Sequence, residues 1–177
     1  MHAEIEVIIL PYFADGEKTV GNLLAEALSS GKWERFQSAV AFARQTGNFD
    51  EIVSALRVFA SKGGKVEMTF GADTFGTEGR GSDYQAIHTL LSELKEDAEV
   101  FLYHEKGRTF HPKLYIFSNG VNKEALLIVG SSNWSQGGFF TNIEANIVVK
   151  LDLTQAEHLA CYEHVQTLFK DYWQEVE

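Results

Sequence analysis

Short runs of apolar residues alternate with helical patterns along the chain. Between the runs, apolar residues recur at spacings of three and four, which is typical of amphipathic helices, whereas the runs themselves are short enough to be buried strands. The runs predict strands at residues 4–10, 36–43, 65–70, 99–103, 113–117, 124–129 and 143–151. The periodic segments predict helices with apolar stripes over residues 20–28, 49–59, 87–94 and 159–172.

The order of these elements predicts the fold class. Strands that alternate with helices are typical of α/β proteins, in which helices cover a largely parallel sheet. Asn119-Gly120 separates two apolar runs, and this dipeptide favours a hairpin of antiparallel strands. We therefore expect an α/β fold with a mixed β-sheet sandwiched by helices, parallel early in the chain and antiparallel near the hairpin. No repeat or linker divides the chain, so residues 1–177 are expected to form a single domain.

Polar residues spaced by three mark the expected helix starts. A short polar side chain followed three residues later by Glu or Gln is the pattern of a capping box. The pairs that fit it are Asn48 with Glu51, Ser82 with Gln85 and Thr154 with Glu157. Trp134 and Phe139-Phe140 are expected to pack in the core or in a dimer interface. Cys161 is expected to be a small core residue, and because it is the single cysteine it excludes an intrachain disulfide.

The charge of the chain argues against a simple nucleic-acid-binding protein. Fifteen Lys and Arg residues against twenty-five Asp and Glu residues leave a net charge of -10, whereas nucleic-acid-binding proteins usually carry a basic face. The charge is uneven, because Lys106, Arg108 and Lys113 are balanced only by Glu105 within residues 104–113. A local basic strip on an acidic body is therefore expected.

The hydropathy pattern does not predict a membrane protein. The first residues lack the basic segment of a secretory leader, and no apolar run approaches the roughly 20 residues that span a bilayer. No amphipathic basic helix is evident, so we expect no stable membrane association. The expected location is cytoplasmic.

The candidate chemistry lies on one strand and in a later turn. Side chains alternate along a strand, so His111 and Lys113 are expected on the same side, which places an imidazole beside a fixed positive charge. Gly130-Ser131 at the end of the next run predicts a tight turn whose hydroxyl and N–H groups are able to meet an anion. Asn133 adds a neutral amide donor.

A carboxylate completes this set. Glu144 is able to hold an imidazole N–H and thereby select the tautomer. Together the groups suit a phosphodiester, since they provide donors for two oxygens and a nucleophile for phosphorus. Taken one at a time, such residues are more often structural, as an edge lysine or as turn-forming Ser and Asn. Their joint occurrence in this order favours a catalytic site.

The segment resembles the HKD motif of the phospholipase D superfamily. In that motif a His-x-Lys pair on one strand is followed by Gly-Ser-x-Asn after the next strand, and then by an acidic residue. Upstream, residues 38–73 are similar to single-motif members: bacterial endonucleases, metal-independent restriction-enzyme catalytic domains and helicase-associated modules. The matching residues are His111, Lys113, Gly130, Ser131, Asn133 and Glu144.

Two features depart from the motif. Ser118 stands where the superfamily often has Asp, and the interval from Lys113 to Gly130 is longer than the compact pattern. The Asn119-Gly120 hairpin is expected to absorb the longer interval. Ser118 keeps open a non-catalytic role for the chain.

The resemblance implies a homodimeric enzyme. Two motifs form one active site in the superfamily, and this chain has one His-x-Lys pair. One His111 is then implied as the nucleophile that forms a phosphohistidine, and His111 of the partner subunit as the acid that protonates the leaving oxygen. Lys113, Asn133 and Ser131 are implied as stabilisers of the phosphoryl oxygens, and Glu144 as the residue that orients His111.

The resemblance also implies no metal and no cofactor, because lysines and amides supply the electrostatics. The residues around the motif suggest further contacts. Gly130 is expected to contact the substrate through its backbone, and Arg108 in the basic strip is expected to contact further phosphates. The glycine-rich residues 71–81 are either a rim of the site, with Arg80 as a phosphate contact, or a plain surface loop.

These predictions favour a metal-independent phosphodiesterase, most simply a nuclease with DNA favoured over RNA. The acidic balance of the chain suggests that a separate DNA-binding or helicase partner could supply affinity. One alternative is a phospholipid phosphodiesterase or transferase. Another is a non-catalytic dimerisation module of a larger nucleic-acid-processing system.

Overall fold

The structure is a computed structural model that describes residues 4–10, 19–72 and 81–172. The strands within these ranges are β1 (Glu4–Leu10), β2 (Arg35–Val40), β3 (Lys65–Gly71), β4 (Ala98–Tyr103), β5 (Lys113–Asn119), β6 (Glu124–Gly130) and β7 (Glu144–Asp152). The α-helices are α1 (Val20–Ser29), α2 (Phe49–Ser61), α3 (Tyr84–Leu94) and α4 (Ala156–Asp171). A 3-10 turn (Lys95–Asp97) precedes β4, and a π-helical turn (Gly137–Thr141) precedes β7.

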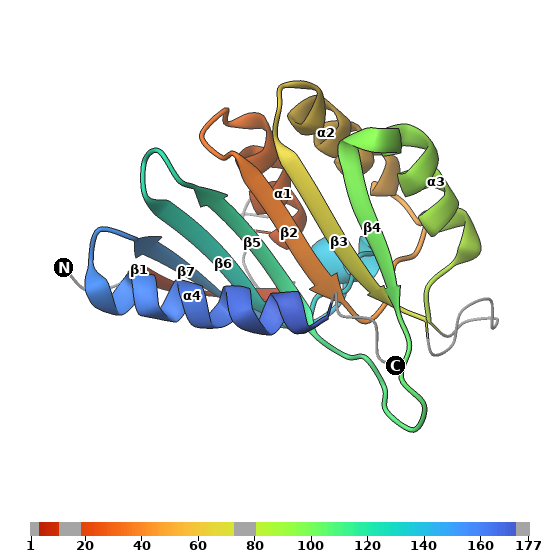
Figure 1. Ribbon diagram of the computed structural model, residues 1–177. Coiled ribbons are helices and arrows are strands. Elements are labelled where there is room, and N and C mark those ends of the chain that lie inside the picture. Colours follow the sequence, from red (N-terminus) through yellow and green to blue (C-terminus); the bar gives the residue numbers. More distant parts are fainter. Residues whose placement is uncertain (1–3, 11–18, 73–80, 173–177) are drawn as a thin grey trace.

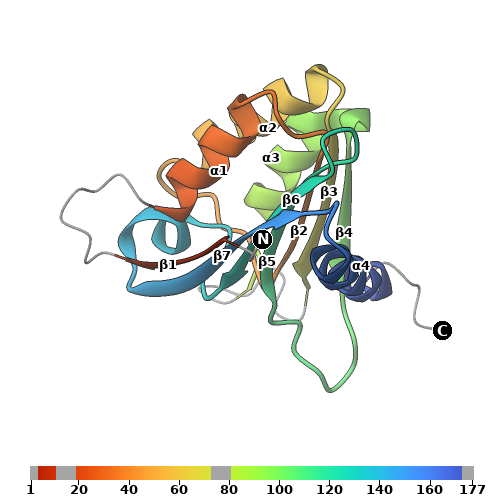
Figure 2. The same ribbon diagram turned by 90° about the vertical axis from the view of Figure 1, so that its left-hand side faces the viewer.

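All seven strands form one mixed sheet in the order β1-β7-β6-β5-β2-β3-β4. The pairs β2–β3 and β3–β4 are parallel, whereas β2–β5, β5–β6, β6–β7 and β1–β7 are antiparallel. Helices α1, α2 and α3 cover one face and α4 lies on the other (Figure 1; Figure 2). The predicted α/β fold, with a mixed sheet between helices, is confirmed. None of the helices in the described ranges is both long and apolar enough to cross a bilayer.

The apolar core is divided by the sheet. The larger cluster lies under α1, α2 and α3, and its aromatic centre contains Trp134, which contacts Phe36, Phe70 and Phe139. A smaller cluster on the other face packs under α4. The predicted packing role of Trp134 and Phe139 is confirmed, because both side chains are buried in the larger cluster.

Three local predictions were wrong, at Ser82, Thr154 and Cys161, and the one at Asn48 was correct in position only. Asp83, not Ser82, is the N-cap of α3, because the buried Ser82 hydroxyl instead joins Ala43 N to Gly71 O. Gln155 is the N-cap of α4, since Thr154 bonds back to Asp152. Asn48 is the N-cap of α2, and its amide donates to Glu51, but its side chain accepts no backbone N–H. Cys161 is exposed on α4 rather than buried.

The strand predicted at 36–43 ends early, at Val40. The next residues leave the sheet and pair with the segment after β6: Arg44 N donates to Trp134 O at 2.8 Å, and Trp134 N donates to Phe42 O at 3.2 Å. The predicted hairpin is present between β5 and β6. It closes through residues 120–123 rather than through a two-residue turn, with Lys123 at a φ of 53°.

Candidate active site

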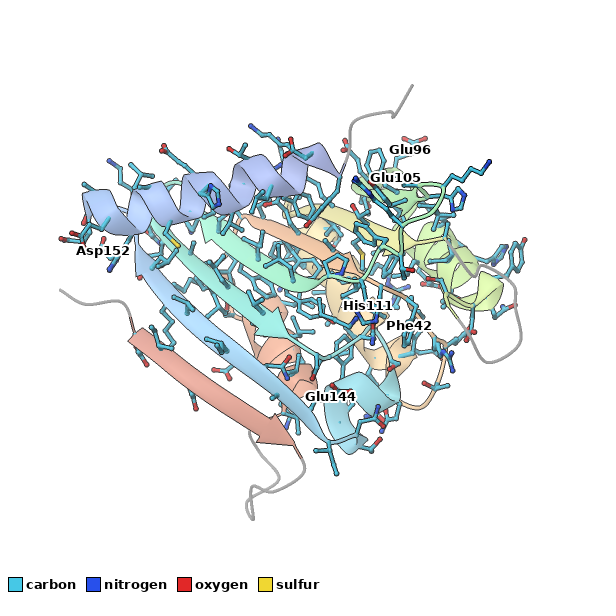
Figure 3. The ribbon with its side chains drawn as sticks, turned by 90° about the horizontal axis from the view of Figure 1, so that it is seen from below. Phe42, Glu96, Glu105, His111, Glu144 and Asp152 are labelled. Carbon is cyan, nitrogen blue, oxygen red and sulfur yellow. The ribbon has the colours of Figure 1, made fainter. Side chains whose placement is uncertain are left out.

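The candidate residues meet at one end of the sheet for a topological reason. β5 begins at Lys113, β6 ends at Gly130 and β7 begins at Glu144. Because β5–β6 and β6–β7 are antiparallel, these three strand ends lie at the same end of the sheet. Figure 3 shows His111 and Glu144 on this side of the molecule.

Lys113 and His111 are in direct contact. The Lys113 Nζ lies 3.0 Å from Nδ1 and 3.1 Å from Nε2 of His111, and it donates to the His111 carbonyl oxygen at 3.1 Å. An ammonium has donors only, so a ring nitrogen that bonds it acts as the acceptor, and which of the two does so depends on the tautomer. The arrangement holds a positive charge directly against the imidazole.

The backbone around this pair is held by β2. Ala41 N donates to Pro112 O at 2.9 Å, which fixes the residue between His111 and Lys113. The sequence analysis placed His111 on the same strand as Lys113, but His111 lies just before β5. Its side chain is exposed. Lys113 is only 7% exposed. The pair thus combines an accessible imidazole with a lysine sheltered from water.

Burial also changes the acidity of Lys113. Desolvation lowers the pKa of its ammonium, and the negative charge of Glu144 opposes this in part. A lysine that is both sheltered and charged exerts a strong field, because water screens it less. Such a group suits the stabilisation of phosphoryl oxygens.

The Gly130-Ser131 turn is tied to the start of β7. A Cβ on Gly130 would overlap the carbonyl oxygen of Ala145, so this close approach of β6 to β7 requires glycine. Ser131 N donates to Ala145 O at 3.1 Å, and Ala145 N donates to Ser131 Oγ at 3.0 Å. The Ser131 hydroxyl in turn donates to Glu144.

Glu144 therefore has defined partners within this chain. Its carboxylate accepts from Ser131 Oγ and from Asn142 Nδ2, the latter at 3.3 Å. In the described part of the chain no hydrogen bond joins Glu144 to His111. Its role in orienting an imidazole stays a prediction, whereas its contact with the Gly-Ser turn is observed.

Asn133 reaches the same edge from the turn after β6. The π-helical turn packs closely against it, since a Cβ on Gly138 would overlap the Asn133 backbone. The Asn133 Oδ1 is buried and has no hydrogen-bond donor among the residues that the structure describes. Asn133 is thus held by its backbone and by the buried Trp134 that follows.

The predicted phosphate contacts fall in different places. Arg108 belongs to the β4–β5 loop, which projects beyond the site end of the sheet (Figure 1; Figure 2). Arg108 N donates to Glu105 O at 3.2 Å, and Gly107 between them has a φ of 82°, which a tight turn of this kind requires. The Arg108 guanidinium is exposed and pairs with Glu105 at 3.3 Å. Arg80 lies outside the described residues.

Ser118, which replaces the motif Asp, is distant from the chemistry along the strand. It is buried near the far end of β5, where it pairs with Arg35 and Ala125. Its carbonyl oxygen accepts from Glu34 N at 3.0 Å. At this position the residue contributes to strand pairing.

The carboxyl end of β2 adds residues that the sequence analysis missed. β2 is antiparallel to β5, so Phe42 and Arg44 follow β2 at the edge where β5 begins. The Arg44 guanidinium lies 5.0 Å from the centre of the Phe42 ring. The signal available in the sequence was their place directly after a buried strand.

A large cavity lies away from these residues. It has a volume of about 750 Å³ and is lined by the end of α1, the segment after α1, the hairpin end of β6, the end of β7 and the start of α4, including Trp33, Leu126 and His158. None of the candidate site residues lines it. The candidate site instead lies at the end of the sheet where β5 begins and β6 ends.

Comparison with known proteins identifies the family of the chain. A family model described as "Cardiolipin synthase, PLD-like domain" matches residues 24–173. The chain belongs to the phospholipase D-like family. Members of this superfamily are phosphodiesterases, which confirms the predicted enzyme class. No curated protein matches the sequence at a significant level.

Solved structures of the superfamily share the fold. NucT from Helicobacter pylori has a TM-score of 0.62 and 21% identity, over 96% of this chain and 97% of its own. Nuc from Salmonella typhimurium, a phospholipase D family member, has a TM-score of 0.63 and 18% identity, over 97% and 95%. Phosphatidylserine synthase from Haemophilus influenzae has a TM-score of 0.67 and 9% identity, over 96% of this chain and 39% of its own. At these identities the likeness establishes the fold alone.

Proposed function

We propose that this phospholipase D-like chain is a metal-independent nuclease that acts as a homodimer, with DNA favoured over RNA as substrate. The observation that carries the proposal is the contact of the buried Lys113 Nζ with the exposed His111 ring beside the Gly130–Asn133 turn. The similarity in length and fold to NucT and Nuc supports a nuclease over a lipid enzyme.

The reaction follows from these groups. A His111 ring nitrogen attacks phosphorus, so a P–N bond forms while the P–O bond to the leaving group breaks. His111 of the partner subunit donates a proton to that leaving oxygen. The same imidazole then removes a proton from water, whose oxygen attacks phosphorus and breaks the P–N bond. Lys113 and the donors of the turn stabilise the negative oxygens in both steps.

The surface around the site supports the pairing of two copies. Val129, Ile143 and Ile147 are exposed. Val129 is next in sequence to Gly130, Ile143 is next to Glu144, and Ile147 is the register partner of Val129 in the β6–β7 pair. In Figure 3 the strands β1 and β7 are seen without a covering helix on the side that also shows His111 and Glu144. A second copy that brings its His111 to this edge would cover the exposed aliphatic side chains.

A charge in this apolar strip should separate the two copies. Ile147 is 47% exposed, and Ile147→Asp places a carboxylate where the partner would exclude water. We expect the mass from sedimentation to fall from that of a dimer to that of a monomer, and phosphodiester hydrolysis to fall at least about tenfold with it.

The control for this variant lies at the other end of the sheet. Val121 is 80% exposed in the β5–β6 loop, so Val121→Asp should change neither mass nor activity. A wild-type chain that sediments as an active monomer would refute the dimer. An Ile147→Asp variant that remains an active dimer would refute this face as the interface.

The function is tested by cleavage in the presence of EDTA. We expect nicking of plasmid and degradation of single-stranded DNA without a divalent metal. Because the body of the chain is acidic, binding should depend on a few local phosphate contacts, so cleavage should decline less between about 50 and 200 mM salt than for a protein that neutralises many phosphates. Release of headgroup from phosphatidylcholine vesicles without DNA cleavage would favour the lipid alternative, and inactivity toward both substrates would favour the non-catalytic one.

A further inference from the structure

Ser132 is a buried link between the exposed Ser131 and the half-buried Asn133 of the site. It lies between Ser131 and Asn133, and its own side chain is fully buried. Its N–H donates to Asn146 Oδ1 at 3.4 Å, and its Oγ accepts from Asn146 Nδ2 at 2.9 Å. Its carbonyl oxygen accepts from the Tyr115 hydroxyl at 2.8 Å. Every polar group of Ser132 is therefore held by a side chain of β5 or β7.

The two side chains that hold Ser132 are themselves sheltered. Asn146 is 2% exposed and Tyr115 is fully buried. Burial raises the pKa of the Tyr115 phenol well above its ordinary value, so the hydroxyl remains a neutral donor. Hydrogen bonds in such surroundings are costly to break, because the remaining partner is left without water. The link is thus rigid as well as specific.

The glycine of the Gly-Ser turn makes room for this link. Gly130 is the register partner of Asn146 in the β6–β7 pair. A Cβ on Gly130 would overlap the Asn146 Oδ1. The absence of a side chain on Gly130 therefore lets the Asn146 amide pass across β6 and reach Ser132.

We propose that Asn146, together with Tyr115, is a positioning residue of the active site: it clamps Ser132 and so fixes the directions in which Ser131 and Asn133 present their donors. Asn146 acts through Ser132 and not on the substrate. The proposal rests on the proposed phosphodiesterase function and adds to it a residue outside the HKD pattern. A small displacement of donors aimed at a transition state is sufficient to slow a reaction substantially.

The decisive variant is Asn146→Leu, which keeps the volume and removes both hydrogen bonds. With bis(p-nitrophenyl) phosphate in EDTA, we expect kcat to fall about 10- to 100-fold with little change in KM, because the lost interactions matter mainly in the transition state. Tyr115→Phe, which removes one oxygen, should lower kcat in the same direction by a smaller factor. The double variant Ser132→Ala, Asn146→Leu should be no slower than Asn146→Leu alone, since both changes remove one link.

The matched control is another buried asparagine of the same sheet. Asn119 is 6% exposed at the far end of β5, where its amide bonds Lys32 O and its Oδ1 accepts from Asn122 N. Asn119→Leu should lower the melting temperature but leave the kcat of the folded enzyme unchanged. Equal losses of kcat in Asn119→Leu and Asn146→Leu would show a general effect on the fold and overturn the proposal.

A second measurement does not depend on activity. Amide hydrogen exchange at residues 131–133 should accelerate in Asn146→Leu and remain as in wild type in Asn119→Leu. Unchanged exchange in Asn146→Leu would overturn the positioning role, even if wild type is active. An inactive wild type with accelerated exchange in the variant would instead refute the proposed function and leave the clamp established.

Discussion

Replacing His111 with alanine should abolish phosphodiester hydrolysis, with a fall in kcat of at least about 10⁴-fold. In a homodimer the change removes both the nucleophile and the general acid, and the loss of acid–base catalysis by itself accounts for about 10²- to 10⁴-fold. The measurement is hydrolysis of bis(p-nitrophenyl) phosphate in EDTA, followed by cleavage of plasmid DNA under the same conditions.

The control for this variant is an exposed histidine outside the site. His88 lies on α3 beside Tyr84, so His88→Ala should retain full activity. The fold of His111→Ala should be intact, because the His111 side chain is exposed. Residual activity above about one part in a hundred would exclude His111 as the nucleophile, since it would exceed what the remaining groups are expected to supply.

Replacing Lys113 with methionine should have opposite effects on activity and stability. Removal of one preorganised charged donor is expected to lower kcat by about 10²- to 10³-fold. Yet the ammonium is desolvated, and among the described residues no carboxylate forms an ion pair with it. An apolar side chain of similar length avoids that desolvation, so Lys113→Met should raise the melting temperature.

The pH dependence gives a further check on this variant. Because the folded-state pKa of Lys113 lies below its ordinary value of 10.5, the unfolded chain binds more protons in the interval between the two. The contribution of Lys113 to the free energy of unfolding of the wild type therefore rises as the pH increases through that interval. The difference in melting temperature between Lys113→Met and wild type should be largest at neutral pH and should shrink toward pH 10.5.

A constant difference across that range would contradict the desolvation of Lys113. The dependence of activity on pH should report the protonation of Lys113 independently. In a plot of wild-type kcat against pH, the alkaline decline should begin below the ordinary lysine range, because the Lys113 ammonium loses its proton at a lower pH than a solvated one. Lys113→Arg, whose side chain stays charged, should extend that limb to higher pH while lowering kcat through altered geometry.

The proposed variants change different measured properties. His111→Ala and Lys113→Met change the chemistry and should leave the mass unaltered, whereas Ile147→Asp changes the mass and the activity together. Asn146→Leu should lower kcat and accelerate amide exchange at residues 131–133 without changing the mass. These four variants therefore separate catalysis, assembly and positioning by different measurements.

Much of the fold was predictable because its signals are local. Apolar runs and stripes placed the seven strands and four α-helices of the described ranges close to their observed bounds. The alternation of elements predicted parallel pairing, and Asn119-Gly120 predicted the antiparallel pair β5–β6. The cap assignments at Ser82 and Thr154 failed, because a tertiary contact in one case and a local turn in the other used those hydroxyl groups.

The sequence by itself determined which chemical groups are present and in which order: the His111–Lys113 pair, the Gly-Ser turn, Asn133 and Glu144. Only the tertiary structure decided how these groups contact one another. It placed Lys113 against the imidazole of His111, Glu144 against Ser131, and Asn146 against Ser132. The physical reason is that periodicity encodes which face a side chain takes, whereas contacts between strand ends depend on sheet order and register, which arise from packing of the whole chain.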